Sequence, residues 1–132
     1  MAAYLRGTGR AVTLAPDGEL ARCDYDRHGT PVVVTLRQFS GVSLALSVPV
    51  CPLERVRPRS ALVANGELPI GVLAVAEGQI VLRQTLPLAS LPAAVLEETL
   101  GALSDVAAQL LLVAARVADD PERETPYGYL FR

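Results

Sequence analysis

A long apolar stripe in the last third of the chain limits the folds available to it. Leucine, alanine and valine recur at alternating spacings of four and three residues, which places them on one side of a single α-helix. These residues are Leu96, Leu100, Leu103, Ala107, Leu110, Ala114 and Val117. A helix with such a stripe has to bury it, so we expect a helix from about Ser90 to Ala118 that covers a sheet.

The sheet is expected from five segments that precede this helix. In the clearest of them, apolar and small residues alternate with a period of two, as in a strand with one buried face. Leu44, Leu46, Val48 and Val50 alternate there with Ser43, Ala45, Ser47 and Pro49. The other expected strands are Glu19 to Asp26, Thr30 to Gln38, Gly71 to Glu77 and Gln79 to Leu86. Turn signals at His28-Gly29 and Gly78 predict antiparallel hairpins.

Two further helices complete the expected order. Ala2 to Arg6 is long enough for a turn or two, and the stretch from Leu53 to Asn65 has helical apolar spacing. Pro58 interrupts the second stretch, so that helix is either kinked or begins near Pro58. The order α-β-β-β-α-β-β-α predicts an α+β fold with a five-stranded antiparallel sheet.

A chain of 132 residues, 51% of them hydrophobic, is long enough for one core and too short for two ordinary domains. We expect one domain over 1–118 and a flexible tail over 119–132, although Tyr127, Tyr129, Leu130 and Phe131 lie in that tail. No apolar run of signal-peptide length follows the N-terminus, which predicts a cytoplasmic protein. The apolar stretch Val106 to Ala118 contains Gln109 and Arg116, which favours a packed helix over a membrane span.

The charged and reactive residues favour no enzyme class. All 12 basic residues are arginines, which excludes lysine Schiff-base chemistry, and the net charge of −2 provides no general attraction to nucleic acid. His28 is the one histidine, with Asp24 and Asp26 near it in sequence, and a solvated turn explains it better than a catalytic base. Cys23 and Cys51 lack close-spaced ligand companions and are expected to be reduced and buried. We therefore expect no catalysis, no metal and no cofactor.

Three groups of residues are candidates for contact with a protein partner. The first is the small-residue strand face Ser43, Ala45 and Ser47, where an extended peptide would bind unless helices cover it. The second is the basic cluster Arg55, Arg57 and Arg59, which is a solvated helix face, a contact for an acidic protein segment or, less favourably, one for nucleic acid. The third is the aromatic set Tyr127, Tyr129 and Phe131.

Apolar residues left over by the helix stripe suggest self-association. The middle and last helices carry more apolar surface than packing against one sheet needs. We expect a homodimer interface that includes Leu53, Val56, Leu62, Val106 and Val113.

The run from Ser60 to Gly71, with the sequence SALVANGELPIG, resembles the YbjN family. Asn65, Gly71 and Gly78 match the asparagine at the end of the middle helix, the glycine that opens a strand and the hairpin glycine. The resemblance covers about Gly18 to Ala118 and implies a fold similar to that of type III secretion chaperones, which bind partner polypeptides. The abbreviated first helix and Pro58 depart from the family pattern.

Together these features predict a non-catalytic, cytoplasmic homodimer that binds protein partners in a chaperone-like or regulatory role. The alternative is an accessory protein of DNA metabolism or the stress response that acts through a protein partner, with at most weak direct contact to nucleic acid.

Overall fold

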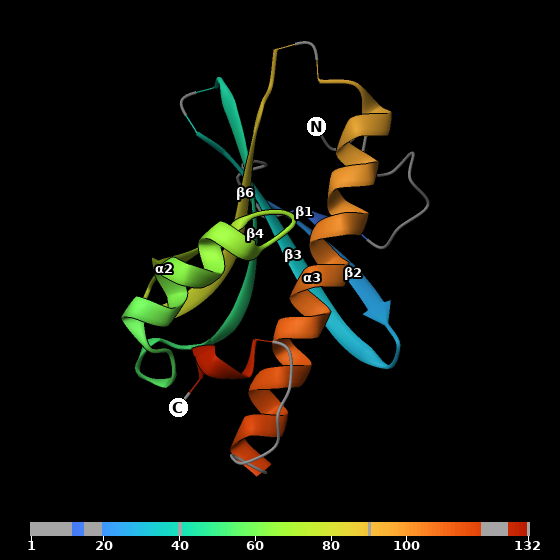
Figure 1. Cartoon of the computed structure of the whole chain (residues 1–132). Coiled ribbons are helices and arrows are strands. Elements are labelled where there is room, and N and C mark those ends of the chain that lie inside the picture. The colour runs from blue at the N-terminus through green and yellow to red at the C-terminus, as the bar shows by residue number, and fades with distance from the viewer. Residues whose placement is uncertain (1–11, 15–19, 40, 90, 120–126, 132) are drawn as a thin grey trace.

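The computed structural model describes residues 12–14, 20–39, 41–89, 91–119 and 127–131, and Figure 1 shows its arrangement. The strands are β1 (Val12–Leu14), β2 (Leu20–Arg27), β3 (Thr30–Phe39), β4 (Ser43–Pro52), β5 (Val72–Ala76) and β6 (Gln79–Pro87). The helices are η1 (Leu53–Arg55), α2 (Pro58–Glu67), α3 (Ala93–Asp119) and η2 (Gly128–Leu130), of which η1 and η2 are short 3₁₀ helices. The strands form one sheet in the order β1-β2-β3-β4-β6-β5, and all pairs are antiparallel.

The predicted α+β fold with a five-stranded antiparallel sheet is confirmed by β2 to β6. The structure adds β1, a three-residue strand that pairs with β2 at one edge and that the sequence did not reveal. The helix expected over Ala2 to Arg6 lies outside the described residues.

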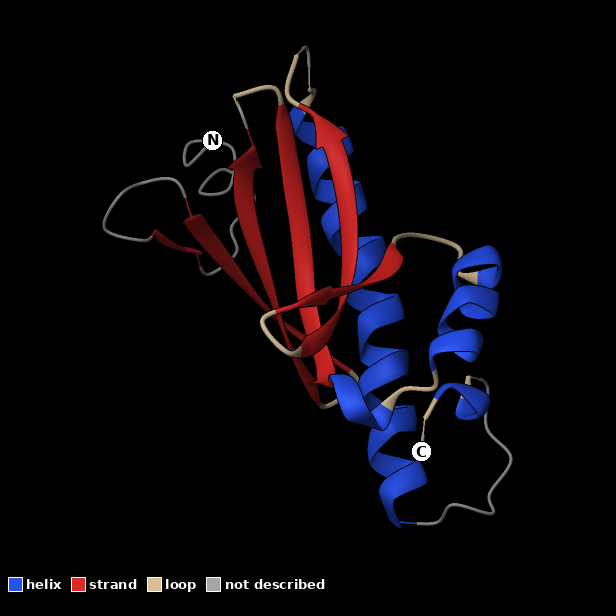
Figure 2. Cartoon of the chain, turned by 90° about the vertical axis from the view of Figure 1, so that its left-hand side faces the viewer, coloured by secondary structure: helices blue, strands red, loops and turns tan. Residues whose placement is uncertain are grey.

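The helix α3 lies across one face of the sheet, over β2, β3 and β4 (Figures 1 and 2). All seven residues of its predicted stripe are buried, between 0% and 7% exposed. Facing them are the buried sheet residues Cys23, Val34, Leu46, Val48 and Leu82. By length and hydropathy α3 would also be able to span a membrane, but 56% of that apolar window is buried inside the chain, as in the core helix of a folded domain.

The opposite face of the sheet carries a polar row. The strand registers bring Arg22, Thr35, Ser47 and Arg83 into one row across four strands. Thr35 Oγ1 donates to the Ser47 carbonyl at 3.0 Å, and Arg83 Nε donates to Ser47 Oγ at 3.3 Å. This side of the sheet therefore carries hydrogen-bonded polar side chains where the other side carries the core.

The helix α2 begins at Pro58, which settles the alternative that the sequence left open. Proline lacks the N–H group that a helix interior needs, but at the first helical position that group has no intrahelical acceptor. The residues before it, Leu53–Arg55, form η1 as a separate turn, and Val56 between them is extended.

The last described residues are packed against the domain, which differs from the expected flexible tail. Leu130 is 0% exposed and Phe131 is 3% exposed. Arg57 N donates to the Leu130 carbonyl at 2.9 Å, and Val56 and Phe131 form an antiparallel bridge. The burial of two large apolar side chains and this pairing attach residues 127–131 firmly.

Gly71 fixes the entry into β5. Its φ is +77°, and a Cβ there would lie 3.0 Å from a Leu82 side-chain carbon and 3.1 Å from the Arg83 carbonyl oxygen. We expect Gly71→Ala to lower the free energy of unfolding by about 1–2 kcal/mol, because both the left-handed backbone and the close approach disfavour a side chain. Urea titration measures the change. Gly66→Ala is the control, since a Cβ at Gly66 meets no atom within 4 Å, and equal losses for both variants would contradict the prediction.

Candidate functional site: an apolar groove between α2 and β5

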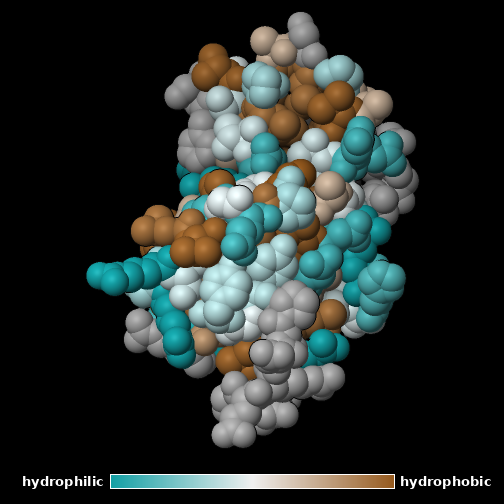
Figure 3. All heavy atoms as spheres, viewed as in Figure 1, coloured by the Kyte–Doolittle hydropathy of each residue, from teal (hydrophilic) through white to brown (hydrophobic). Residues whose placement is uncertain are grey.

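Exposed apolar side chains gather where α2 lies beside the edge strand β5. Leu53 is 40% exposed, Leu62 is 75% exposed and Val75 is 58% exposed. They surround a groove of about 190 Å³, which we call the α2–β5 groove. Its other lining residues are Val56, Pro58, Ala61, Asn65, Leu73, Ala74 and Ile80. In the space-filling view, hydrophobic atoms gather over α2, at the left of the molecule (Figure 3).

Backbone and side-chain hydrogen bonds hold the groove open at both ends. At one end Leu53 N donates to the Gly78 carbonyl at 3.0 Å, which ties η1 to the β5–β6 turn. At the other end Asn65 of α2 bonds to Leu73 of β5. The two walls are therefore fixed to each other, and their apolar side chains stay exposed between the attachment points.

Asn65 occupies the outer edge of β5. Its Oδ1 accepts from Leu73 N at 2.6 Å, and its Nδ2 donates to the Leu73 carbonyl at 3.3 Å. One side-chain amide thus satisfies the two groups that an added strand would use at this residue. Just before the strand, the N–H of Gly71 donates to Gln84 Oε1 at 2.9 Å. At Leu73, therefore, the edge of β5 is closed to an added strand.

The role of Asn65 was not recognised from the sequence, where Asn65-Gly66 suggested the end of the helix. In the structure α2 continues to Glu67, and Asn65 faces β5 from its last turn. The signal present in the sequence was the match of Asn65 to the asparagine of the YbjN pattern, which carries no information about its partner atoms.

The expected basic cluster is divided by the structure. Arg55 is half-buried, and its Nη2 donates to the Ala114 carbonyl of α3 at 2.9 Å, so this guanidinium joins η1 to α3. Arg57 and Arg59 are exposed beside the groove, together with Glu54. The site rim therefore contains two exposed cations and one exposed carboxylate, which suits a protein surface of mixed charge.

Three residues expected at a dimer interface are buried within the chain, which corrects that expectation. Val56 is 4% exposed, Val106 is 6% exposed and Val113 is 5% exposed. The apolar surface of α3 is wider than its stripe because the helix is covered on more than one side, and η2 packs against it as well. Of the five expected interface residues, Leu53 and Leu62 keep exposed side chains.

The small-residue strand face offers less surface than the sequence suggested. Ala45 is 3% exposed and unavailable, whereas Ser43 and Ser47 are half-buried on the polar face of the sheet. The aromatic residues of the tail also separate: Phe131 is buried, Tyr127 is half-buried, and Tyr129 is 41% exposed with its hydroxyl donating to Glu67 Oε2 at 2.9 Å.

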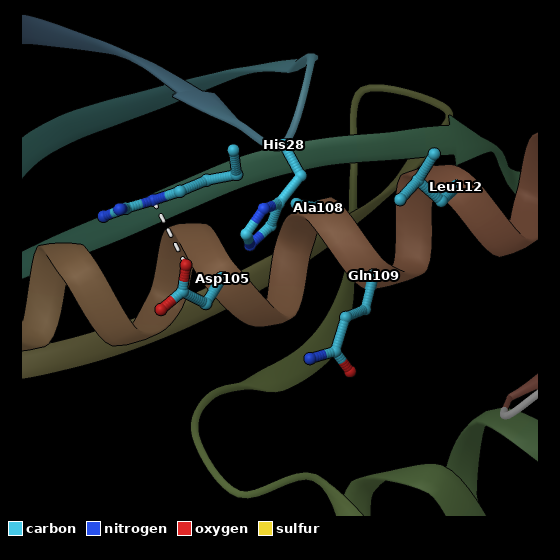
Figure 4. Close-up of a pocket in the computed structure, with 6 residues that line it drawn as sticks. His28, Asp105, Ala108, Gln109 and Leu112 are labelled. Atoms are coloured by element: carbon cyan, nitrogen blue, oxygen red, sulfur yellow. Dashed lines mark ion pairs between the residues drawn. The ribbon is translucent and has the colours of Figure 1, made fainter.

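His28 lies over α3 at the edge of another pocket, with a volume of about 310 Å³ (Figure 4). Arg27 Nε lies 3.2 Å from Asp105 Oδ1 and donates to Ser104 Oγ at 2.8 Å, which attaches the β2–β3 hairpin to the helix. The carboxylates near His28 in sequence act elsewhere: Asp26 accepts from Gly29 N at 2.9 Å, and Asp24 pairs with Arg22 at 3.1 Å. The Asp105 carboxylate in the lining of this pocket pairs with Arg27, so the pocket serves as an attachment point between the hairpin and α3.

Both cysteines are reduced and buried, as expected. Burial raises the pKa of the Cys51 thiol, an effect that Arg55 opposes and Glu54 reinforces. A thiol with a raised pKa is a weak nucleophile at neutral pH. Among the residues that the structure describes, no three His, Cys, Asp or Glu side chains are placed to hold a metal ion.

No protein-family model matches the sequence, and no curated protein matches it. Solved structures share its fold. A chain of the HopA1–SchA chaperone–effector complex is 15% identical with a TM-score of 0.61, and the match covers 83% of this chain and 88% of that one. The Yersinia pestis type III secretion chaperone SycH in complex with a stable fragment of YscM2 gives 16% identity and a TM-score of 0.56, over 83% and 94% of the two chains.

A chain of the ExsC–ExsE complex is 23% identical with a TM-score of 0.55, over 72% of this chain and 74% of that one. At these identities the likeness establishes the fold: this chain has the α+β fold of the type III secretion chaperones.

Proposed function

We propose that this chain is a non-catalytic protein-binding module with a chaperone-like role, and that two copies associate through the α2–β5 groove. The observation that supports this most is the groove itself: three exposed apolar side chains around a fixed hollow, in a fold shared with proteins whose structures contain bound partner chains. Exposed apolar patches on soluble domains commonly mark contacts with other proteins.

A second copy fits the groove for two reasons. A two-fold interface uses the same patch twice, and here α2 presents an apolar ridge at Leu62 beside an apolar hollow, so one copy can place its ridge in the hollow of the other. Asn65 occupies the edge of β5 at Leu73, which favours a contact through side chains, as between two packed helices.

The partner polypeptide is proposed to bind elsewhere, on the polar face of the sheet. Ser43 and Ser47 lie half-exposed there, and the row that includes Arg22, Thr35 and Arg83 offers hydrogen-bonding groups along the sheet. Membership of the YbjN family, a cytoplasmic location and a regulatory role belong to the same proposal.

Self-association is tested with Leu62→Arg. We expect wild type to sediment as a dimer at micromolar concentration, and Leu62→Arg to weaken the dimer at least tenfold, since a charge would be buried in an apolar contact. Sedimentation velocity over a concentration series measures this. Val42→Arg is the matched control, because Val42 is 66% exposed but lies in the β3–β4 turn, outside the groove. Equal dimerisation of both variants would place the interface elsewhere.

Partner binding is tested by affinity capture from the host extract, at high salt and after nuclease treatment. A small set of stoichiometric proteins that survive both treatments supports the proposal. Loss of all captured proteins after nuclease treatment would instead favour the accessory role in DNA metabolism.

A further inference from the structure

The 127–131 segment is bound to the rest of the chain as a peptide ligand is bound. It lies between α2 and the second half of α3, and η2 contacts both helices (Figures 1 and 2). Its attachment to the extended residues Val56 and Arg57 uses the backbone: Arg57 N donates to the Leu130 carbonyl at 2.9 Å, and Val56 pairs with Phe131 in an antiparallel bridge. We call the place it occupies the α2–α3 seat.

Two adjacent apolar side chains fill this seat. Leu130 is 0% exposed and Phe131 is 3% exposed, and both belong to the main hydrophobic core together with Val56 and Val113. Peptide-binding domains commonly combine a short backbone pairing with pockets for side chains, the first for affinity and the second for specificity. Both parts are present here, although the occupant belongs to the same chain.

The local backbone indicates that docking holds the segment in its conformation. Tyr127 has a φ of +62°, which is left-handed and unfavourable for a residue with a side chain. Such a conformation persists where surrounding contacts fix it. Leu130 N donates to the Tyr127 carbonyl at 3.0 Å and closes a turn. This turn, which begins at Tyr127, places Leu130 and Phe131 in the seat.

The seat also extends beyond its occupant. A pocket of about 190 Å³ lies beside Tyr127 and is lined by Gln109, Leu112, Val113 and Arg116 of α3. A longer peptide in the same place would therefore find further apolar surface and one guanidinium next to the two filled positions.

We propose that the α2–α3 seat is a binding site for a short peptide with an apolar–aromatic pair, occupied in cis by residues 127–131 and open to a partner segment of the same chemistry in trans. Residues 127–131 compete with any such partner, because their covalent attachment to the chain gives them an effective concentration on the order of millimolar. This site shares Val56 with the lining of the α2–β5 groove, but it lies toward α3 and does not depend on dimerisation.

The test uses the full chain and a labelled hexapeptide of residues 127–132, Tyr-Gly-Tyr-Leu-Phe-Arg. Leu130→Ala with Phe131→Ala weakens the cis occupant and leaves the seat unfilled. We expect this double variant to bind the hexapeptide in fluorescence anisotropy with an apparent Kd at least tenfold lower than wild type. A hexapeptide with serine in place of both Leu and Phe is the control and should not bind. A folded double variant that binds neither peptide, or both equally, overturns the proposal.

Hydrogen exchange of wild type gives a second test that does not depend on how the variant folds. If the segment leaves its seat while the domain stays folded, the Arg57 amide should exchange at least tenfold faster than the amides of the buried middle of α3. If the Arg57 amide exchanges as slowly as those amides do, the seat opens only on global unfolding and the proposal fails. Repeating the anisotropy in the Leu62→Arg background separates this site from the proposed dimer, because peptide binding should remain unchanged there.

Discussion

Leu103→Ala is expected to lower the free energy of unfolding by about 3–4 kcal/mol. Leu103 is 0% exposed in the middle of the α3 stripe, and one of its methyl carbons lies against Gly71 at the entry to β5. Its truncation removes buried apolar surface and leaves a cavity between the helix and the sheet, where the chain has little freedom to collapse. Urea unfolding at fixed protein concentration measures the loss, since self-association would make stability depend on concentration.

Leu112→Ala is the matched control for this substitution. Leu112 lies on the same helix and is 38% exposed, so the same chemical change should cost about 1 kcal/mol or less. Similar losses at both positions would mean that α3 does not bury its stripe against the sheet in solution, and the packing described here would be wrong.

Asn65→Leu is expected to lower the free energy of unfolding by about 2–3 kcal/mol. The side chain keeps a similar volume, but both hydrogen bonds to Leu73 are lost, and the Leu73 N–H and carbonyl are left against an apolar group. The same substitution removes the amide that occupies the β5 edge. We therefore also expect the variant to aggregate more readily, which light scattering during storage would show.

Asn65→Asp distinguishes the two hydrogen bonds. An aspartate can still accept from Leu73 N, at present a 2.6 Å bond, but it cannot donate to the Leu73 carbonyl and repels it. At neutral pH we expect Asn65→Asp to lower the free energy of unfolding, but by less than Asn65→Leu does. A loss as large as that of Asn65→Leu would show that the hydrogen bond from Asn65 Nδ2 to the Leu73 carbonyl contributes most of the stability. No loss for either variant would contradict the proposed role of Asn65.

Much of the fold could be predicted because its signals are local and periodic. The stripe of α3, the alternation of β4 and the His28-Gly29 turn each follow from the spacing of a few neighbouring residues. The start of α2 was predictable as one of two alternatives, because proline restricts its own backbone. β1 was not, since three residues carry too little pattern and take their structure from pairing with β2.

The candidate site was predicted only in part, because exposure is a property of the assembled chain. Leu62 and Val106 are equally apolar and both lie on helices, yet one is 75% exposed and the other 6%. Which of them is available depends on what packs beside each helix, and that includes residues 127–131, ten or more positions beyond the α3 stripe. The three arginines near α2 show the same limit, since Arg55 donates a hydrogen bond to the Ala114 carbonyl while Arg57 and Arg59 are exposed.

By itself the sequence determined the class of fold, the antiparallel hairpins and the helix that covers the sheet, because hydrophobic periodicity and turn residues act over a few residues along the chain. The tertiary structure alone decided three things: that Asn65 closes the edge of β5, that the α2–β5 groove stays exposed, and that Leu130 and Phe131 are buried between α2 and α3. The first and the third are contacts between segments separated by eight to more than seventy positions in the chain, and no spacing rule within one segment specifies such a contact.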